Sequence, residues 1–247
     1  DTSSLSVIML GTDSWQGEPL QREVYEPRLV EFLNIDHLVA PPNEWQGLPA
    51  AIFPEIFVCP ACRTVENFKN LSNGWQAGRR VFKCRAARCK GNSVRTFPSR
   101  FLIACENGHI DDFPYHDWVH KGKTCSGQVR LFDFGNTGAI TDLQVHCGDC
   151  DAKRPLAQAF ETGALKCSGR EPWLPHRKSQ KCNSSSARLI LRGASNNYFP
   201  VTTSSISIPP WTSPLMTALA PFRESLKNCV SIEDIQHIAH ERLNPQL

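Results

Sequence analysis

The fold is decided in the middle of the chain, by the stretch Cys105-Glu106-Asn107-Gly108-His109-Ile110-Asp111-Asp112-Phe113-Pro114-Tyr115-His116-Asp117-Trp118-Val119-His120. Cys105 and His109 are spaced to turn back on one metal ion, and Gly108 allows the positive φ that such a tight turn often needs. His120 and Cys125 follow at a distance that can complete a tetrahedral site. The predicted zinc site is made of the four ligands Cys105, His109, His120 and Cys125. His116 is an alternative to His120, because a helix would place both on one face at i, i+4 spacing.

Cysteine is the unusual residue in the composition. The chain has 247 residues, of which 40% are hydrophobic and 21% charged, as in an ordinary globular protein, but 11 are cysteines. Cysteines form disulfides in an oxidising compartment and bind metal in a reducing one. The Cys-x-x-Cys pairs Cys59/Cys62 and Cys147/Cys150 favour metal, because a two-residue spacer points both sulfurs at one ion. With no signal peptide and no run of about 18 apolar residues, we expect a reducing, cytoplasmic location and no membrane contact.

Residues 51–100 are predicted to form the first zinc-ribbon module. A second cysteine pair follows the first knuckle after a hairpin-length insert. The four ligands of this site are Cys59, Cys62, Cys84 and Cys89. Four protein ligands leave no open position for water or substrate, so the site is expected to be structural.

The most basic run of the chain lies around the second of these pairs, with no acidic residue between Arg79 and Arg100. Such a run is typical of contact with nucleic-acid phosphates. The candidate nucleic-acid-binding residues are Arg79, Arg80, Lys83, Arg85, Arg88 and Lys90. The alternative is charge compensation, because a zinc ion held by four thiolates carries a net charge of about −2 that nearby cations offset.

Residues 101–200 are predicted to be a second zinc-rich module with two sites. Besides the site described first, the later cysteines supply a Cys₄ set of Cys147, Cys150, Cys167 and Cys182. The spacing also allows the ligands to be exchanged between these two sites, since Cys105 and His109 can pair with either later group. The chain would then hold two to three structural zinc ions, with Cys229 left as a lone buried thiol.

A catalytic alternative is a zinc hydrolase or nuclease built on His109, Asp111, Asp112 and His120. Catalytic zinc normally keeps one position open, whereas this chain has enough cysteines to close each site, and the His-Glu-x-x-His pattern is absent. We therefore expect no enzyme. Asp111 and Asp112 are expected to cap the helix that follows them.

The two ends of the chain contain fewer cysteines. Residues 1–50 contain none and are predicted to be an N-terminal arm or docking segment, with a strand in 5–10 and a helical pattern in 23–33 that Pro27 interrupts. Residues 201–247 are predicted to be a C-terminal helical segment, with Ser231 as the N-cap of its last helix. The expected fold class is zinc-stapled α+β, with small β-hairpin and zinc-ribbon modules and short helices. Because the chain opens at Asp1 without a Met, it reads as a fragment of a longer protein.

The chain resembles the DrmB family of the DISARM anti-phage defence system. The resemblance rests on the stretch 105–120 and on four further pieces: 57–62, 98–101, 167–174 and 192–200. The family's proteins are longer, so the likeness is to their N-terminal, zinc-bearing half. It implies a non-catalytic scaffold subunit that docks a DrmA-like superfamily 2 helicase and assists DNA engagement, with no small-molecule substrate. The alternative is a stand-alone, zinc-dependent nucleic-acid-binding protein.

Overall fold

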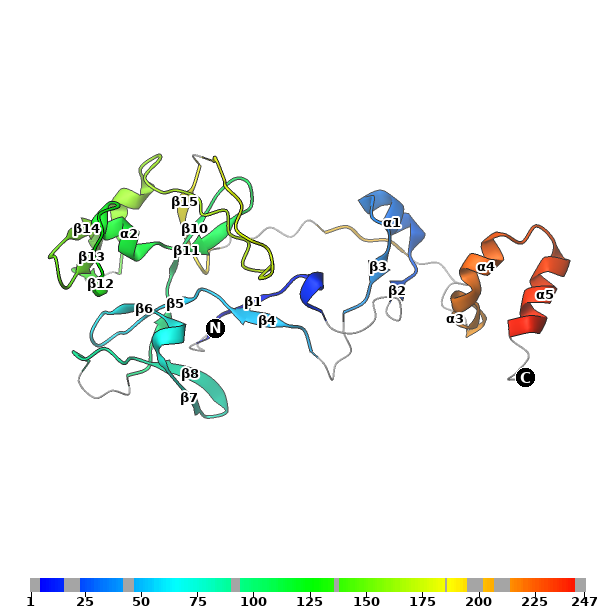
Figure 1. Ribbon diagram of the computed structural model, residues 1–247, viewed down its shortest axis with the longest axis horizontal. Coiled ribbons are helices and arrows are strands. Elements are labelled where there is room, and N and C mark those ends of the chain that lie inside the picture. Colours follow the sequence, from blue (N-terminus) through cyan, green and yellow to red (C-terminus); the bar gives the residue numbers. More distant parts are fainter. Residues whose placement is uncertain are drawn as a thin grey trace. The chain divides into compact units, whose positions relative to one another are not determined.

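The computed structural model describes residues 5–15, 23–41, 47–89, 94–135, 138–184, 186–194, 202–206 and 214–242. It consists of many small antiparallel sheets and a few short helices (Figure 1). The chain divides into two compact units, Asp1–Arg22 with Pro41–Pro200 (unit 1) and Glu23–Ala40 with Val201–Leu247 (unit 2). The expected fold class, with small sheets, short helices and a C-terminal helical segment, is confirmed.

The first half of unit 1 is built from short strand pairs. Strand β1 (Val7–Met9) pairs with β4 (Ala50–Ile52), and β5 (Ile56–Val58) lies between β6 (Val65–Asn67) and β9 (Phe97–Pro98). The hairpin of β7 (Ser72–Gln76) and β8 (Arg79–Lys83) turns at Ala77 and Gly78, which both have positive φ, as a two-residue hairpin turn requires. A small aromatic core of Phe57, Phe68 and Phe82 holds the hairpin to β5.

The second half of unit 1 contains two three-stranded antiparallel sheets. In one, β10 (Phe101–Ala104) lies between β11 (Ile110–Asp112) and β15 (Arg188–Leu191). In the other, β13 (Leu143–Cys147) lies between β12 (Val129–Asp133) and β14 (Lys153–Pro155). The short helix α2 (Tyr115–His120) and the 3₁₀ turn η5 (Leu156–Phe160) complete this half.

The main hydrophobic core lies among these elements. Phe101, Phe113, Val145 and Leu156 are at most 1% exposed, and Trp118 of α2 packs against Phe113 with ring centroids 5.6 Å apart. Burial of this much aromatic and aliphatic surface stabilises the two sheets and α2 as one core. The positions of the cysteines on these elements therefore become fixed by packing.

Unit 2 is largely helical. It contains β2 (Glu23–Val24), α1 (Pro27–Leu33) and β3 (Leu38–Val39), followed by α3 (Pro214–Leu219), η7 (Ala220–Phe222), α4 (Arg223–Lys227) and α5 (Ile232–Arg242). The helical pattern predicted over 23–33 is wrong in its first part, because Pro27 begins α1 and does not interrupt it; proline is favoured in the first helical turn.

The N-cap predicted at Ser231 is confirmed. The backbone N–H of Asp234 donates to Ser231 Oγ at 3.2 Å, and the N–H of Ser231 donates to Asp234 Oδ2 at 2.9 Å, a reciprocal cap. The cap begins α5 at the residue after Ser231. None of the helices in the described residues is long and apolar enough to cross a lipid bilayer.

Candidate metal centres

Twelve cysteine and histidine side chains of unit 1 gather in three groups of four. Within each group all ligand atoms lie within 4.8 Å of one another. We call them the first cluster (Cys59, Cys62, Cys84, Cys89), the second cluster (Cys105, His109, Cys167, Cys182) and the third cluster (His120, Cys125, Cys147, Cys150). All 11 cysteines of the chain are free thiols, so the structure does not support the disulfide alternative.

The spacing of the sulfur atoms fits a tetrahedral zinc ion. With Zn–S bonds of about 2.3 Å, two sulfurs on one tetrahedral ion lie about 3.8 Å apart. The Sγ–Sγ distances are 3.8 Å for Cys59–Cys89, 3.6 Å for Cys62–Cys84, 3.7 Å for Cys125–Cys147, and 3.5 Å for Cys105–Cys167. A disulfide would need about 2.05 Å. The donor set and its geometry in each cluster therefore suit one zinc ion.

The first cluster contains the four cysteines that the spacing predicts. Cys59 follows β5, Cys84 follows β8, and the turn between Cys59 and Cys62 is closed by the N–H of Cys59 donating to the Thr64 carbonyl at 2.9 Å. Arg63, which has a φ of 64°, lets the chain reverse within this knuckle. Three of the four ligands are at most 3% exposed, so the cluster forms a small core of its own.

The predicted division of the other eight ligands into two sites is wrong. Cys105 and His109 join Cys167 and Cys182, whereas His120 and Cys125 join Cys147 and Cys150. The physical reason is the pairing of the strands. The hairpin β12–β13 pairs Val129 with Cys147, which brings Cys125 back to the second knuckle, and β15 pairs Arg188 with Ala104, which brings Cys182 to Cys105.

His120 is prepared to bind metal through one nitrogen. Its Nδ1 lies 2.8 Å from the carbonyl oxygen of His116, which can only accept, so Nδ1 carries the proton. The residue is only 4% exposed, and its buried Nε2 has no hydrogen-bond partner among the described residues. A metal ligand explains this orphaned nitrogen, since ligating histidines commonly donate their other N–H to a carbonyl. His116 is outside the cluster.

Two of the clusters share a Cys-Ser-Gly turn, a repeat that the sequence reasoning missed. The N–H of Gly127 donates to Cys125 Sγ at 3.4 Å, and the N–H of Gly169 donates to Cys167 Sγ at 3.3 Å. In the first cluster the N–H of Ala86 donates to Cys84 Sγ at 3.4 Å in the same way. A donor directed at sulfur stabilises thiolate, the form that binds metal. The tripeptide Cys-Ser-Gly occurs at 125–127 and at 167–169, and this repeat in the sequence indicates the shared turn.

Each cluster includes one thiol whose pKa is lowered. Burial raises the pKa of Cys62, but hydrogen bonds from Thr64 outweigh it and bring the pKa to about 7. Burial also raises the pKa of Cys147, but the backbone N–H groups of Asp149 and Cys150 lower it to about 6. The backbone N–H of Ser184 is the main cause that lowers the pKa of Cys182 to about 6. These thiols are the ones most readily ionised near neutral pH.

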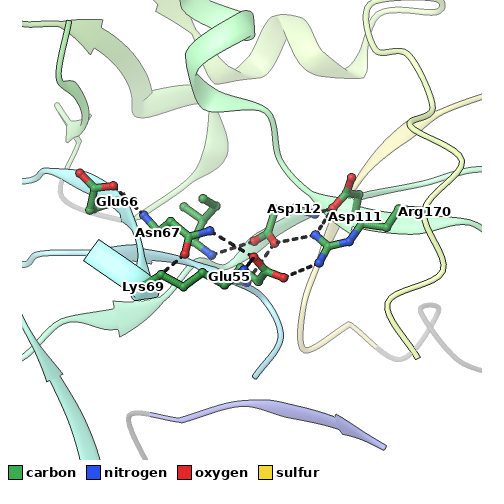
Figure 2. Close-up of polar contacts among 8 residues, drawn as sticks. Glu55, Glu66, Asn67, Lys69, Asp111, Asp112 and Arg170 are labelled. Atoms are coloured by element: carbon green, nitrogen blue, oxygen red, sulfur yellow. Dashed lines mark hydrogen bonds and ion pairs between the residues drawn. The ribbon is translucent and has the colours of Figure 1, made fainter. Parts of the chain in front are cut away.

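Asp111 and Asp112 have a different role from the one predicted. Figure 2 shows Arg170 between Asp111 and Glu55. Arg170 Nη1 donates to Asp111 Oδ1 at 2.9 Å, and the Asp112 carboxylate accepts the backbone N–H groups of Glu55 (2.9 Å) and Ile56 (3.1 Å). The expected cap on α2 is wrong, because Pro114 occupies the N-cap position and no side chain caps it. Burial raises the pKa of Asp112 to about 6, although the two N–H groups act against this.

The same contacts leave the hydrolase constellation unassembled. His109 and His120 belong to different clusters, and both aspartates are engaged by Arg170 or by backbone N–H groups. The network instead joins β11 to the start of β5, which lie more than 50 residues apart in sequence. The four residues proposed for catalysis are therefore not brought to one ion.

The candidate nucleic-acid-binding residues separate into two places. Arg79 and Arg80 are exposed near the tip of the β7–β8 hairpin, and Trp75, paired with Arg80, is 75% exposed. Lys83 is half-buried at the end of β8. Arg85 and Arg88 are exposed, but the Arg88 guanidinium lies against Gly148 in the third cluster's knuckle, which suits charge compensation. Lys90 lies outside the described residues, and Trp75 was missed because it precedes the basic run.

Comparison with known proteins agrees with the resemblance seen in the sequence. The family described as "Domain of unknown function (DUF8724)" matches residues 1–199. The "DISARM protein DrmB" of Bacillus paralicheniformis (strain ATCC 9945a / NCIMB 11709 / CD-2) is 30% identical over 216 residues, which cover 85% of this chain and 37% of that protein. The chain therefore spans little more than a third of that relative, and the resemblance to DrmB is confirmed at this level. Because the family match covers most of its length, the chain belongs to the DUF8724 family.

Proposed function

We propose that the chain is a non-catalytic scaffold of a DrmB-like DISARM component, held together by three structural zinc ions. The observation that carries this proposal is the set of three clusters, each with four protein ligands. Four protein ligands fill a tetrahedral zinc ion, and no position remains for a reacting water or substrate. The similarity to the DISARM protein DrmB supplies the anti-phage context.

The scaffold's partners follow from the resemblance and from one surface. The resemblance implies docking of a DrmA-like superfamily 2 helicase. The exposed cations of the β7–β8 hairpin support a DNA contact made through that complex, since neither Arg79 nor Arg80 forms an ion pair with a described acid. Unpaired arginines release counterions from phosphates when they bind DNA, which gives affinity without sequence preference.

Affinity capture tests the scaffold proposal. The tagged chain is isolated from its native host, and proteins that remain bound after a high-salt wash are identified by mass spectrometry. A helicase recovered in near-equal amount supports the proposal. Recovery of the chain without a helicase contradicts the docking role and favours a stand-alone nucleic-acid-binding protein.

The DNA contact has its own test, a double charge reversal on the hairpin. Arg79→Glu/Arg80→Glu should weaken DNA binding by the complex and reduce the slope of log affinity against log salt by about 2, one for each lost phosphate contact. The matched control is Lys178→Glu/Arg188→Glu, which makes the same change in net charge at two exposed positions elsewhere in unit 1. Equal losses of DNA affinity in both variants would show that binding depends on the net charge of the chain and not on the hairpin.

A further inference from the structure

The outer face of the β12–β13–β14 sheet carries a group of aromatic rings. Alternation along β13 buries Leu143, Val145 and Cys147 and turns Gln144 and His146 outward. The residues that share this outer face by strand register are Arg130, Phe132, Phe134, Gln144, His146 and Lys153, and we call them the aromatic face.

The three rings of the aromatic face form one continuous patch. Phe132 and Phe134 are stacked, with centroids 6.0 Å apart and planes 23° apart, and His146 lies 4.6 Å from Phe132 and 5.7 Å from Phe134. Phe134 is 68% exposed. Phe132 and His146 are half-buried beside it. Single exposed phenylalanines are common, but an exposed ring that continues into two half-buried rings needs a reason.

The sheet holds these rings in fixed positions. Its inner face packs into the main core through Val145, which is fully buried, and β13 ends at Cys147, a ligand of the third cluster. A zinc ion at that end would tie the sheet to α2 through His120. Rings presented by a rigid sheet lose little conformational entropy when a flat ligand stacks on them.

Two cations flank the rings. Arg130 places its guanidinium carbon 5.0 Å from the Phe132 centroid, and Lys153 pairs with His146 across β13 and β14. Two acids lie at the Phe134 end of this face. The Asp142 carboxylate lies against Gly135 in the β12–β13 loop, and Asp133 Oδ1 accepts the backbone N–H of Gly135 at 3.1 Å. The face therefore combines aromatic rings with two cations at the end opposite these acids.

We propose that the aromatic face binds single-stranded nucleic acid, with bases stacked on Phe132, Phe134 and His146 and phosphates near Arg130 and Lys153. Flat rings beside cations suit unpaired bases, because stacking accepts any base and the cations follow the backbone. A duplex cannot use this surface in the same way, since its bases are already stacked on one another. This surface is additional to the β7–β8 hairpin and does not depend on helicase docking.

Fluorescence anisotropy with a labelled 20-mer of deoxythymidine tests the proposal on the purified 247-residue chain. Loss of one stacked base costs about 5- to 150-fold in affinity, so Phe134→Ala should weaken binding at least fivefold, while Phe134→Trp should retain it. The matched control is Phe160→Ala, another exposed phenylalanine of unit 1 that lies outside this sheet and should change affinity less than twofold. A 20-mer of uridine in parallel distinguishes DNA from RNA as the strand preferred.

Each outcome is informative. The proposal is supported if Phe134→Ala weakens binding and Phe160→Ala does not, and if a 5-iododeoxyuridine oligonucleotide cross-links on illumination to a peptide within 130–146. If Arg79→Glu/Arg80→Glu abolishes binding and Phe134→Ala does not change it, the aromatic face is not a nucleic-acid site, although the hairpin contact stands. If the wild-type chain binds a duplex more tightly than the single-stranded 20-mers, the proposal is overturned. If it binds neither 20-mer, and Phe134→Ala loses a protein that the wild-type chain retains in affinity capture, the proposal is overturned in favour of protein docking.

Discussion

Replacing Gly169 by alanine should abolish zinc binding at the second cluster. Gly169 has a φ of 68° and closes the Cys-Ser-Gly turn of the second cluster. A Cβ built on it would lie 1.6 Å from the carbonyl oxygen of Gln180. This oxygen belongs to backbone and cannot move without the segment that leads to Cys182.

The size of the required movement can be worked from these distances. Non-bonded heavy atoms rest at about 3.2 Å or more, so the segment at Gln180 must shift by about 1.6 Å. A zinc site tolerates deviations of about 0.2 Å in its ligand distances. Because Cys182 is only two residues beyond Gln180, a shift of this size removes its sulfur from the ion.

Zinc content by inductively coupled plasma mass spectrometry is the assay, and Gly163→Ala is the control. Gly163 also has a positive φ, 75°, but no atom lies within 4 Å of its built Cβ. Both variants carry the left-handed backbone cost of about 1–2 kcal/mol, so a difference between them reports the clash alone. We expect two ions for Gly169→Ala and three for Gly163→Ala. Three ions in both, with equal melting temperatures, would refute the reasoning.

Three further predictions concern the clusters and the contacts around them. The His120→Phe variant should bind one zinc ion fewer than the wild-type chain, because phenylalanine fills the space without a ligand nitrogen. The His116→Phe variant, changed outside the cluster, should bind three zinc ions. Native mass spectrometry counts the ions in both variants. Arg170→Met should lower the free energy of unfolding in urea by about 2 kcal/mol, because it leaves Asp111 without an ion-pair partner and Glu55 with Lys69 alone. Arg177→Met, at a more exposed pair with Glu171, should change the free energy by less than about 0.5 kcal/mol. Equal effects would contradict a special role for the network. Removal of metal by a strong chelator should unfold unit 1 and leave the circular dichroism of the unit 2 helices, since unit 2 contains none of the clusters; loss of both signals together would count against this.

Local spacing predicts the ligands well because a knuckle is a local structure. Cys59 and Cys62 reach one ion through a single turn, and the sequence alone indicates this. The partner of a knuckle is decided by strand pairing, so the exchange between the second and third clusters required the register of β12 with β13 and of β15 with β10. An antiparallel hairpin recognised between 129 and 147 would have predicted the third cluster.

The polar network could not be predicted in the same way. Arg170 and Glu55 are 115 residues apart, and no periodicity links an arginine beside a Cys-Ser-Gly turn to a glutamate before a strand. The aromatic face can be predicted from the sequence only in part. Alternation along β12 places Arg130, Phe132 and Phe134 on one side, but only the pairing with β13 adds His146 to them.

The number of zinc ions in the purified chain is the most direct test of the structure described here. Native mass spectrometry under non-reducing conditions counts bound zinc and detects any disulfide in the same spectrum. Three clusters of four ligands predict three zinc ions per chain and no disulfide among the 11 cysteines. Fewer than three ions in the wild-type chain, or a mass that shows a disulfide between any of the ten cysteine ligands, would contradict it.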